Sequence, residues 1–229
     1  MTAAEQAEFI KKSLGPAFGR AGIKTKIVIY DHNPNRTDYP IEVLNDTAAR
    51  QYVDGTAFHM YQGPVDSISE VHRVHPDKNL YFTEQWVGAP ENFAEELKWH
   101  VRTLLIGAVR NWCKTVIEWN LAADKNQDPH TDGGCYNCLG AVTLNGDTLT
   151  RNVAYYIIAH ASKFVTPGSV RIESNSTDQL PNVAFLTPEG KLVLIVLNDS
   201  EQLMQFGVKY QDRYIFSSLA AGAASTITW

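Results

Sequence analysis

Apolar and polar positions follow two different patterns along the chain. In the first part, stretches with helical spacing alternate with short apolar runs rich in β-branched residues. Helices are expected at 3–21, 38–51, 67–75, 91–112 and 150–161, and strands at 26–30, 55–61, 80–82 and 115–121. Strands that alternate with helices form a parallel sheet with right-handed crossovers. The first part is therefore predicted to contain four parallel strands.

Local signals mark the ends of the first expected helix. Thr2 and Glu5 have the spacing of a capping box, which would make Thr2 the N-cap. Gly22 is the expected C-terminal cap. Gly15-Pro16 should interrupt or kink this helix, because proline lacks a backbone N–H.

From Phe164 onward the pattern changes to short strands separated by turns. These strands are expected at 169–173, 183–187, 191–197, 204–210, 213–216 and 225–229. Turn-forming segments stand between them, among them Pro188-Glu189-Gly190 and Asn198-Asp199-Ser200. Such spacing is typical of an antiparallel β-sandwich.

Polar and aromatic residues stand where each of the four parallel strands ends. They are Asp31 and Asn33, His59 and Tyr61, Glu84 and Trp86, and Trp119 and Asn120. In a (β/α)8 TIM barrel, the carboxyl ends of eight strands build the active site, so four strands predict half of one. We expect an α/β domain over residues 1–163, which is a partial (β/α)8 barrel, and an all-β sandwich domain over residues 164–229.

Charge and hydropathy exclude several classes of function. The net charge of -5 is mild and no run of Lys and Arg occurs, so nucleic acid is not expected as the main partner. No apolar run approaches the roughly 18 residues of a membrane-spanning helix. The first residues lack the basic and apolar regions of a signal peptide. His59, His32 and Asp31 do not have metal-ligand spacing, so no metal and no other cofactor is expected.

Three cysteines leave more than one interpretation open. Cys135 and Cys138 form a Cys-Tyr-Asn-Cys pair, and Cys113 stands alone within a helical pattern. A single pair is a weak indication of zinc, which usually takes four ligands. A disulfide that closes the loop and two free thiols both fit the spacing, and redox catalysis is the least favoured interpretation.

Several motifs, matching in order, resemble glycoside hydrolase family 30 and its glucosylceramidases, β-glucosidases and β-xylosidases. They are Ala57-Phe58-His59-Met60-Tyr61, Phe82-Thr83-Glu84, Trp119-Asn120-Leu121-Ala122, Gly133-Gly134, and residues 155–164 before a Pro-Gly-Ser-Val-Arg-Ile strand. The resemblance covers essentially the whole chain. It implies a (β/α)8 barrel with an attached β-sandwich, of which this sequence would hold strands five to eight. It also implies a carbohydrate or sphingolipid substrate and a secreted or periplasmic location.

The resemblance assigns roles to residues at the strand ends. Glu84 would be the nucleophile of a retaining mechanism that uses two glutamates, Tyr61 would hydrogen-bond it, and His59 would orient the site. The candidate substrate-binding residues are His59, Tyr61, Trp86, Trp119, Asn120, Asp31 and Asn33. Trp86 has a second interpretation, as packing at the barrel rim. Asp31 and Asn33 could equally cap a loop, and His130 and Tyr136 would shape the entrance.

The acid/base glutamate of the family lies in an Asn-Glu-Pro motif, which this sequence lacks. Without a proton donor, activity should fall by the roughly 10²–10⁴-fold that general acid catalysis supplies. Glu118 is the other carboxylate beside a matched strand end. It has two interpretations: an outward-facing or supporting residue, or a substitute acid/base supplied in cis or by a partner chain.

Two functions from different classes follow. The first is a β-glycosidase that acts on β-glucosides or β-xylosides by double displacement, with Glu84 as nucleophile. The second is a catalytically inactive carbohydrate-binding or structural remnant, with Trp86, Trp119 and Tyr61 as a sugar platform. A third interpretation is that the sequence is a fragment of a longer enzyme.

A half barrel would leave two parallel edges and an apolar face in water. Such surfaces are normally covered. The sequence therefore predicts a homodimer in which two copies complete one barrel. In it, Glu118 of the partner would lie near the place of the missing acid/base.

Overall fold

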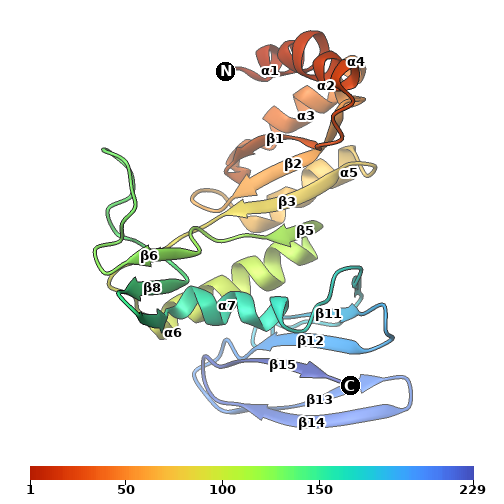
Figure 1. Cartoon of the computed structure of the whole chain (residues 1–229). Coiled ribbons are helices and arrows are strands. Elements are labelled where there is room, and N and C mark those ends of the chain that lie inside the picture. The colour runs from red at the N-terminus through yellow and green to blue at the C-terminus, as the bar shows by residue number, and fades with distance from the viewer. The chain divides into compact units, whose positions relative to one another are not determined.

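The computed structural model describes residues 1–229 as two compact units. The first unit contains residues 1–85 and 108–117, and the second contains residues 86–107 and 118–229. Helices and strands alternate in the first part of the chain, and strands dominate the C-terminal part (Figure 1). No helix is both long enough and apolar enough to cross a bilayer.

A parallel sheet of four strands organises the first unit. Its order is β1 (Ile27–His32), β2 (Val53–His59), β3 (Asn79–Glu84) and β5 (Cys113–Val116). Every neighbouring pair is parallel, so each connection must cross over to the next strand. The four predicted parallel strands are therefore confirmed.

The core of the first unit comes from the apolar strand runs and the apolar faces of the helices. Its fully buried side chains include Ile10, Ile29, Leu44, Phe58, Ile68, Leu80 and Phe82. Gly55 lies where β2 meets β3, and a Cβ there would collide with the backbone oxygen of Asn79. Only glycine therefore allows this close approach of the two strands.

The first expected helix is continuous but changes type. It consists of α1 (Ala3–Phe9), the π-helical segment η1 (Ile10–Leu14) and α2 (Gly15–Ala21). The Gly15 N–H donates to the Ile10 oxygen, five residues earlier, so the wider turn comes directly before Pro16. Gly15-Pro16 thus marks a change of helix type, where the sequence had suggested an interruption.

The predicted caps of this helix are confirmed. Thr2 Oγ1 accepts from the Glu5 backbone N–H at 3.3 Å, and Glu5 Oε2 accepts from the Thr2 N–H at 2.7 Å. Gly22 has a φ of 65°, in the left-handed region that glycine adopts without strain.

The remaining helices of the first unit are shorter than the pattern predicted. They are η2 (Pro34–Arg36), α3 (Asp38–Asn45), α4 (Thr47–Arg50), η3 (Val65–Ser67) and α5 (Ile68–Val74). The helix expected over 38–51 divides because Asp46 leaves the helical conformation and caps α4. Its Oδ1 accepts from the backbone N–H groups of Ala48 and Ala49.

The second unit contains the β-sandwich and two long helical segments. One sheet has the order β10 (Val170–Ile172), β11 (Asn182–Leu186), β12 (Leu192–Leu197) and β15 (Ala224–Thr228), and β13 (Met204–Tyr210) pairs with β14 (Arg213–Leu219). All these pairs are antiparallel, as predicted. All six residues of β12 are buried, which explains why that strand is continuously apolar.

Helices of the barrel domain contact the sandwich directly. The region expected as one helix over 91–112 comprises α6 (Phe93–His100) and η4 (Val101–Ala108). Lys98 Nζ on α6 lies 3.2 Å from Asp199 Oδ1, and Arg102 also pairs with Asp199. On α7 (Val153–Ser162), the His160 oxygen accepts from Thr226 Oγ1 at 2.9 Å.

Five short strands in the second unit were not predicted. They are β4 (Val87–Gly88), β6 (Ala122–Asp124), β7 (Cys138–Leu139), β8 (Val142–Asn145) and β9 (Thr148–Arg151). β8 and β9 form a hairpin whose turn contains Gly146 with a φ of 59°. Conversely, the strand expected at 115–121 is shorter than predicted and corresponds to β5.

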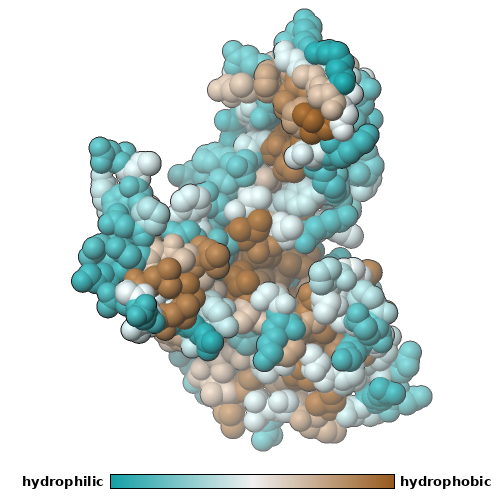
Figure 2. Space-filling model, viewed as in Figure 1, coloured by the Kyte–Doolittle hydropathy of each residue, from teal (hydrophilic) through white to brown (hydrophobic).

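Large apolar side chains also reach the surface. Figure 2 shows hydrophobic residues in patches between hydrophilic ones on the face in view. The exposed large side chains include Val28, Ile117, Trp119, Leu121, Tyr156 and Phe216.

Candidate active site

The carboxyl ends of three neighbouring strands bring Asp31, His59 and Glu84 together. His59 in β2 lies opposite Glu84 in β3. The register shifts between Tyr30 and His32 in β1, and between Phe58 and His59 at the β2–β3 pair, so Asp31 and Thr83 are the extra residues of two bulges. Such bulges re-aim side chains, and the Thr83 hydroxyl donates to Asp31 Oδ1 at 2.7 Å.

The backbone of β1 is strained at this point. Asp31 has a φ of 57° and Tyr30 a φ of 75°, a region that side-chain-bearing residues rarely adopt. The conformation is stabilised by bonds on both sides, since Asp31 accepts from Thr83 and the Tyr30 hydroxyl donates to the Asn33 oxygen. Strain held in this way often coincides with functional sites.

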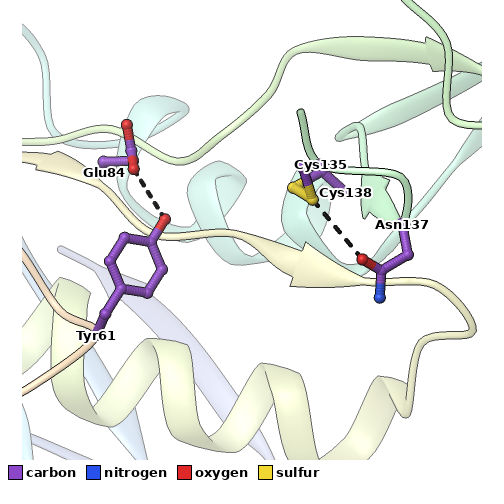
Figure 3. The surroundings of a disulfide bond; sticks show 5 residues. All are labelled: Tyr61, Glu84, Cys135, Asn137 and Cys138. Carbon is purple, nitrogen blue, oxygen red and sulfur yellow. Dashed lines mark hydrogen bonds between the residues drawn. A yellow bond between two sulfur atoms is a disulfide. The ribbon is translucent and has the colours of Figure 1, made fainter. Parts of the chain in front are cut away.

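One oxygen of the Glu84 carboxylate receives the contacts of the cluster. The Tyr61 hydroxyl donates to Glu84 Oε1 at 3.0 Å, and Figure 3 shows the phenol pointing at this oxygen. His59 Nδ1 lies 3.6 Å from the same oxygen. Neither of these contacts involves the other oxygen, Oε2.

The Asp31 carboxylate fixes the orientation of the His59 ring. His59 Nε2 lies 3.1 Å from Asp31 Oδ1. Because a carboxylate only accepts, the proton of this bond belongs to Nε2. This bond directs Nδ1 toward Glu84. His59 therefore contacts the Asp31 carboxylate with one ring nitrogen and the Glu84 carboxylate with the other.

Tyr61 is held as a hydrogen-bond donor. Burial, together with its bond to Glu84, raises the pKa of the Tyr61 phenol far above its ordinary value. The group therefore keeps its proton at neutral pH and donates to the carboxylate. Asn33, which is 4% exposed, supports Tyr61 from the other side, because its Oδ1 accepts from the Tyr61 backbone N–H at 2.8 Å.

The second unit holds the other predicted site residues. Trp86 and Trp119 are joined by a parallel β-bridge, and Trp119 is 50% exposed. The backbone oxygen of Asn120 accepts from Ala141 N–H at 2.8 Å, and its side-chain oxygen is buried without a hydrogen-bond partner.

Glu118 lies in a closed environment. Its side chain is 4% exposed, and Oε1 lies 2.9 Å from Nδ1 of the buried His100. Its Oε2 is buried and has no hydrogen-bond partner. A carboxyl group enclosed in this way cannot reach a glycosidic oxygen without leaving His100. Its role as substitute acid/base remains a prediction that this conformation does not support.

A disulfide forms a small ring in the segment before β7. Cys135 and Cys138 are bonded, with their Cα atoms 5.5 Å apart (Figure 3), and Cys113 is buried and free. Of the interpretations left open by the spacing, the structure contains the disulfide. Tyr136 packs edge-on to His130 at 4.8 Å and accepts from the Gly133 N–H. No group of three or more His, Cys, Asp or Glu residues is arranged to hold a metal ion.

Sequence reasoning overlooked two residues near these clusters. Thr83 stands inside the Phe-Thr-Glu motif, but its bond to Asp31 depends on a bulge that periodicity does not reveal. His100 appeared as one position of a long helix. Its i,i+4 spacing from Glu96 was readable, whereas its contact with Glu118 links two separate segments.

Comparisons with known proteins cover both parts of the chain. Residues 1–165 match the glycosyl hydrolase family 30 TIM-barrel domain, and residues 168–228 match the β-sandwich domain of the same family. Endo-1,6-β-D-glucanase neg1 of Aspergillus fumigatus is 35% identical over 204 residues, which are 85% of this chain and 40% of that protein. Lysosomal acid glucosylceramidase of Mus musculus is 28% identical over 247 residues, which cover 100% of this chain and 47% of that protein.

Two solved structures are similar over the full chain. The endo-β1,6-glucanase BT3312 superposes with a TM-score of 0.90 at 34% identity, and 54% of its chain is covered. SrfJ from Salmonella typhimurium superposes with a TM-score of 0.92 at 28% identity, and 53% of its chain is covered. The chain thus spans about half the length of the relatives that it matches. It belongs to glycoside hydrolase family 30, and it comprises half of the family's (β/α)8 barrel followed by the β-sandwich domain.

Proposed function

We propose that this chain carries the nucleophile half of a retaining β-glycosidase, with Glu84 as the nucleophile. The observation that supports this most is the cluster at the ends of β1, β2 and β3. In it, Tyr61 and His59 both contact Glu84 Oε1 and leave Oε2 unengaged. A nucleophilic carboxylate needs this combination of fixed orientation and one available oxygen.

The proposed chemistry is a double displacement. Glu84 Oε2 attacks the anomeric carbon, the glycosidic bond breaks, and a glycosyl ester forms on Glu84. Tyr61 keeps its proton and donates to Oε1, which limits rotation of the carboxylate while the other oxygen reacts. Water, which gives a proton to a general base, then attacks the anomeric carbon, the bond between that carbon and Glu84 breaks, and the sugar leaves with its original configuration.

The proton donor for the leaving group is not among the residues of this cluster. The two carboxyl groups of a retaining enzyme stand about 5–5.5 Å apart, and Glu118 is enclosed against His100. The relatives that match are about twice as long as this chain. We propose that the donor is a carboxyl group on polypeptide outside residues 1–229 or on a second copy.

For a protein made of residues 1–229 alone, we propose a homodimer in which two copies complete one barrel. The edge strands β1 and β5 leave backbone groups unpaired on their outer sides. Val28 on β1 is 39% exposed, and Ile117, directly after β5, is 52% exposed. Light scattering at micromolar concentration tests this proposal, and a mass near 25.5 kDa would exclude it.

The substrate proposed is a β-linked glucoside, with β-1,6-glucan as the first polymer to test. Three relatives at 31–35% identity are named endo-1,6-β-D-glucanases, and the structural match at 34% identity is an endo-β1,6-glucanase. The glucosylceramidases are 28–30% identical. A β-xyloside remains the comparison substrate, because no residue of the cluster selects between the two sugars.

Hydrolysis of 4-nitrophenyl β-glucoside and β-xyloside tests the nucleophile. Nitrophenolate is a good leaving group, so the reaction needs little acid assistance. Glu84→Gln should lower kcat/KM by at least about 100-fold. Glu95→Gln is the matched control, since Glu95 is an exposed residue in the first turn of α6. Equal activity of wild type and Glu84→Gln would exclude Glu84 as the nucleophile.

A second function applies if the wild type does not hydrolyse either substrate. The exposed indole of Trp119 and the 41% exposed Tyr61 favour a carbohydrate-binding remnant. Titration with a β-glucan oligosaccharide should then show binding that Trp119→Ala abolishes. Absence of binding by the wild type would exclude this function too.

A further inference from the structure

A buried histidine lies between two carboxylates in the second unit. His100, the last residue of α6, is 1% exposed. Its Nδ1 lies 2.9 Å from Glu118 Oε1, and its Nε2 lies 3.2 Å from Glu96 Oε2. The mechanism proposed above uses none of these three groups.

The contact between His100 and Glu118 is a hydrogen bond. A carboxylate oxygen only accepts, so the donor of this bond is Nδ1. Nε2 lies at ion-pair distance from Glu96 on the same helix. If the donor at the Nδ1 position is removed, Glu118 Oε1 has no partner and the contact must open.

His100 is the hydrogen-bond anchor of the Glu118 side chain. Oε1 of Glu118 bonds His100, whereas Oε2 is buried and has no partner. A buried carboxylate that loses its remaining bond is strongly destabilised. Glu118 is therefore expected to move whenever the His100 contact opens.

Movement of Glu118 would be transmitted to the neighbouring indole. Trp119 follows Glu118 directly, and its backbone forms the bridge to Trp86. After Trp119, the Asn120 oxygen is held by Ala141 N–H. Backbone contacts therefore fix the positions of Trp119 and Asn120. The hydrogen bond of the Glu118 side chain fixes the residue immediately before them.

We infer that His100 is a positioning residue that orients Trp119 for the sugar through its bond to Glu118. This inference rests on the proposed function, because it takes Trp119 as part of a sugar subsite. The charged groups in contact with His100 are Glu96 on its own helix and Glu118 on the facing segment, and the Trp99 ring packs against it at 5.0 Å. Sugar binding should weaken when the bond between His100 and Glu118 is removed.

Two isosteric substitutions separate the two contacts of the ring. The amide nitrogen of His100→Asn takes the place of Nδ1 and can donate to Glu118. The amide nitrogen of His100→Gln takes the place of Nε2 and can donate to Glu96. Glu96→Gln is a further control, because it leaves the bond between His100 and Glu118 in place.

The first readout is the fluorine NMR signal of 5-fluorotryptophan at position 119. The protein has five tryptophans, and the signal of Trp119 is identified by its loss in Trp119→Phe. His100→Asn and Glu96→Gln should keep the wild-type shift, and His100→Gln should change it.

The second readout is the affinity for a β-glucan oligosaccharide. His100→Gln should bind about tenfold more weakly or worse, as expected when a subsite is misplaced, whereas His100→Asn should bind like the wild type. If the wild type binds no sugar, the proposed function fails, and the fluorine signal still decides whether His100 positions Trp119.

Two results would overturn the inference. One is an equal change of the Trp119 signal in His100→Asn and His100→Gln, which indicates a general structural role. The other is an unchanged signal in both. If neither variant folds, Glu118→Ala removes the same bond from its acceptor side, and an unchanged Trp119 signal in that variant contradicts the inference.

Discussion

At the scale of single residues, the hydrogen bond from Tyr61 to Glu84 is the contact on which the proposed active site depends most. Tyr61→Phe removes the phenol oxygen and leaves the ring. A hydrogen bond to a charged group contributes about 1.5–3 kcal/mol, so kcat on the nitrophenyl glucoside should fall roughly 10- to 100-fold. Tyr214→Phe is the matched control, because Tyr214 is 59% exposed on β14. A kcat equal to that of wild type would show that the bond does not assist Glu84.

The same phenol predicts how stability depends on alkaline pH. The pKa of Tyr61 is raised from 10.0 mainly by burial and then by its bond to Glu84. Since the folded protein holds this proton more tightly than the unfolded chain, the contribution of Tyr61 is complete below pH 10.0 and is lost as pH rises beyond it. The difference in unfolding free energy between wild type and Tyr61→Phe should therefore shrink above that pH. Urea unfolding of both proteins on either side of pH 10.0 measures it, and a constant difference would contradict the assignment.

At the scale of secondary structure, the first helix depends on its cap. Thr2→Ala removes the side-chain acceptor of the Glu5 N–H and should lower the free energy of unfolding by about 1 kcal/mol. Thr2→Ser retains a hydroxyl and should restore most of the loss. Urea unfolding compares the three proteins, and equal losses in Thr2→Ala and Thr2→Ser would show that the hydroxyl is not responsible.

Strand β12 is the most buried element of the sandwich. Ile195 in its centre is fully buried, so Ile195→Ala should cost about 2–5 kcal/mol of stability through lost contacts and the cavity left behind. Leu203→Ala is the control, because Leu203 is 63% exposed and should change stability by less than about 0.5 kcal/mol. Thermal unfolding of both variants is the measurement. Similar losses in the two would mean that β12 is not a core strand.

Element boundaries were harder to predict from the sequence than element types. The runs that became β1, β2 and β3 are rich in apolar and β-branched residues, and this pattern is visible without a structure, although only β2 is largely buried. β5 ends at Val116, earlier than predicted, because the residues after it bond to other segments, such as Asn120 to Ala141. The hairpin of β8 and β9 escaped detection because most of its side chains are exposed and show no alternation.

At the scale of the whole molecule, the fold of the family could be predicted from the sequence, whereas the packing of individual side chains could not. The strand ends identified Glu84, Tyr61 and His59 as neighbours, since parallel strands end at one edge of the sheet. The bulges that place Asp31 against Thr83, and the contact of Glu118 with His100, depend on local register and on segments far apart along the chain. The predicted domain boundary between residues 163 and 164 remains a prediction.

The contacts of α6 and α7 with the sandwich have a consequence for how this family can evolve. Lys98 and Arg102 pair with Asp199, and His160 accepts from Thr226, so helices of the barrel domain share one compact unit with the sandwich. A gene segment that encoded only the sandwich strands would lose these partners. Recombination that exchanged the sandwich between two enzymes would therefore have to include both helices. The segment that can be exchanged intact is larger than the β-sandwich itself.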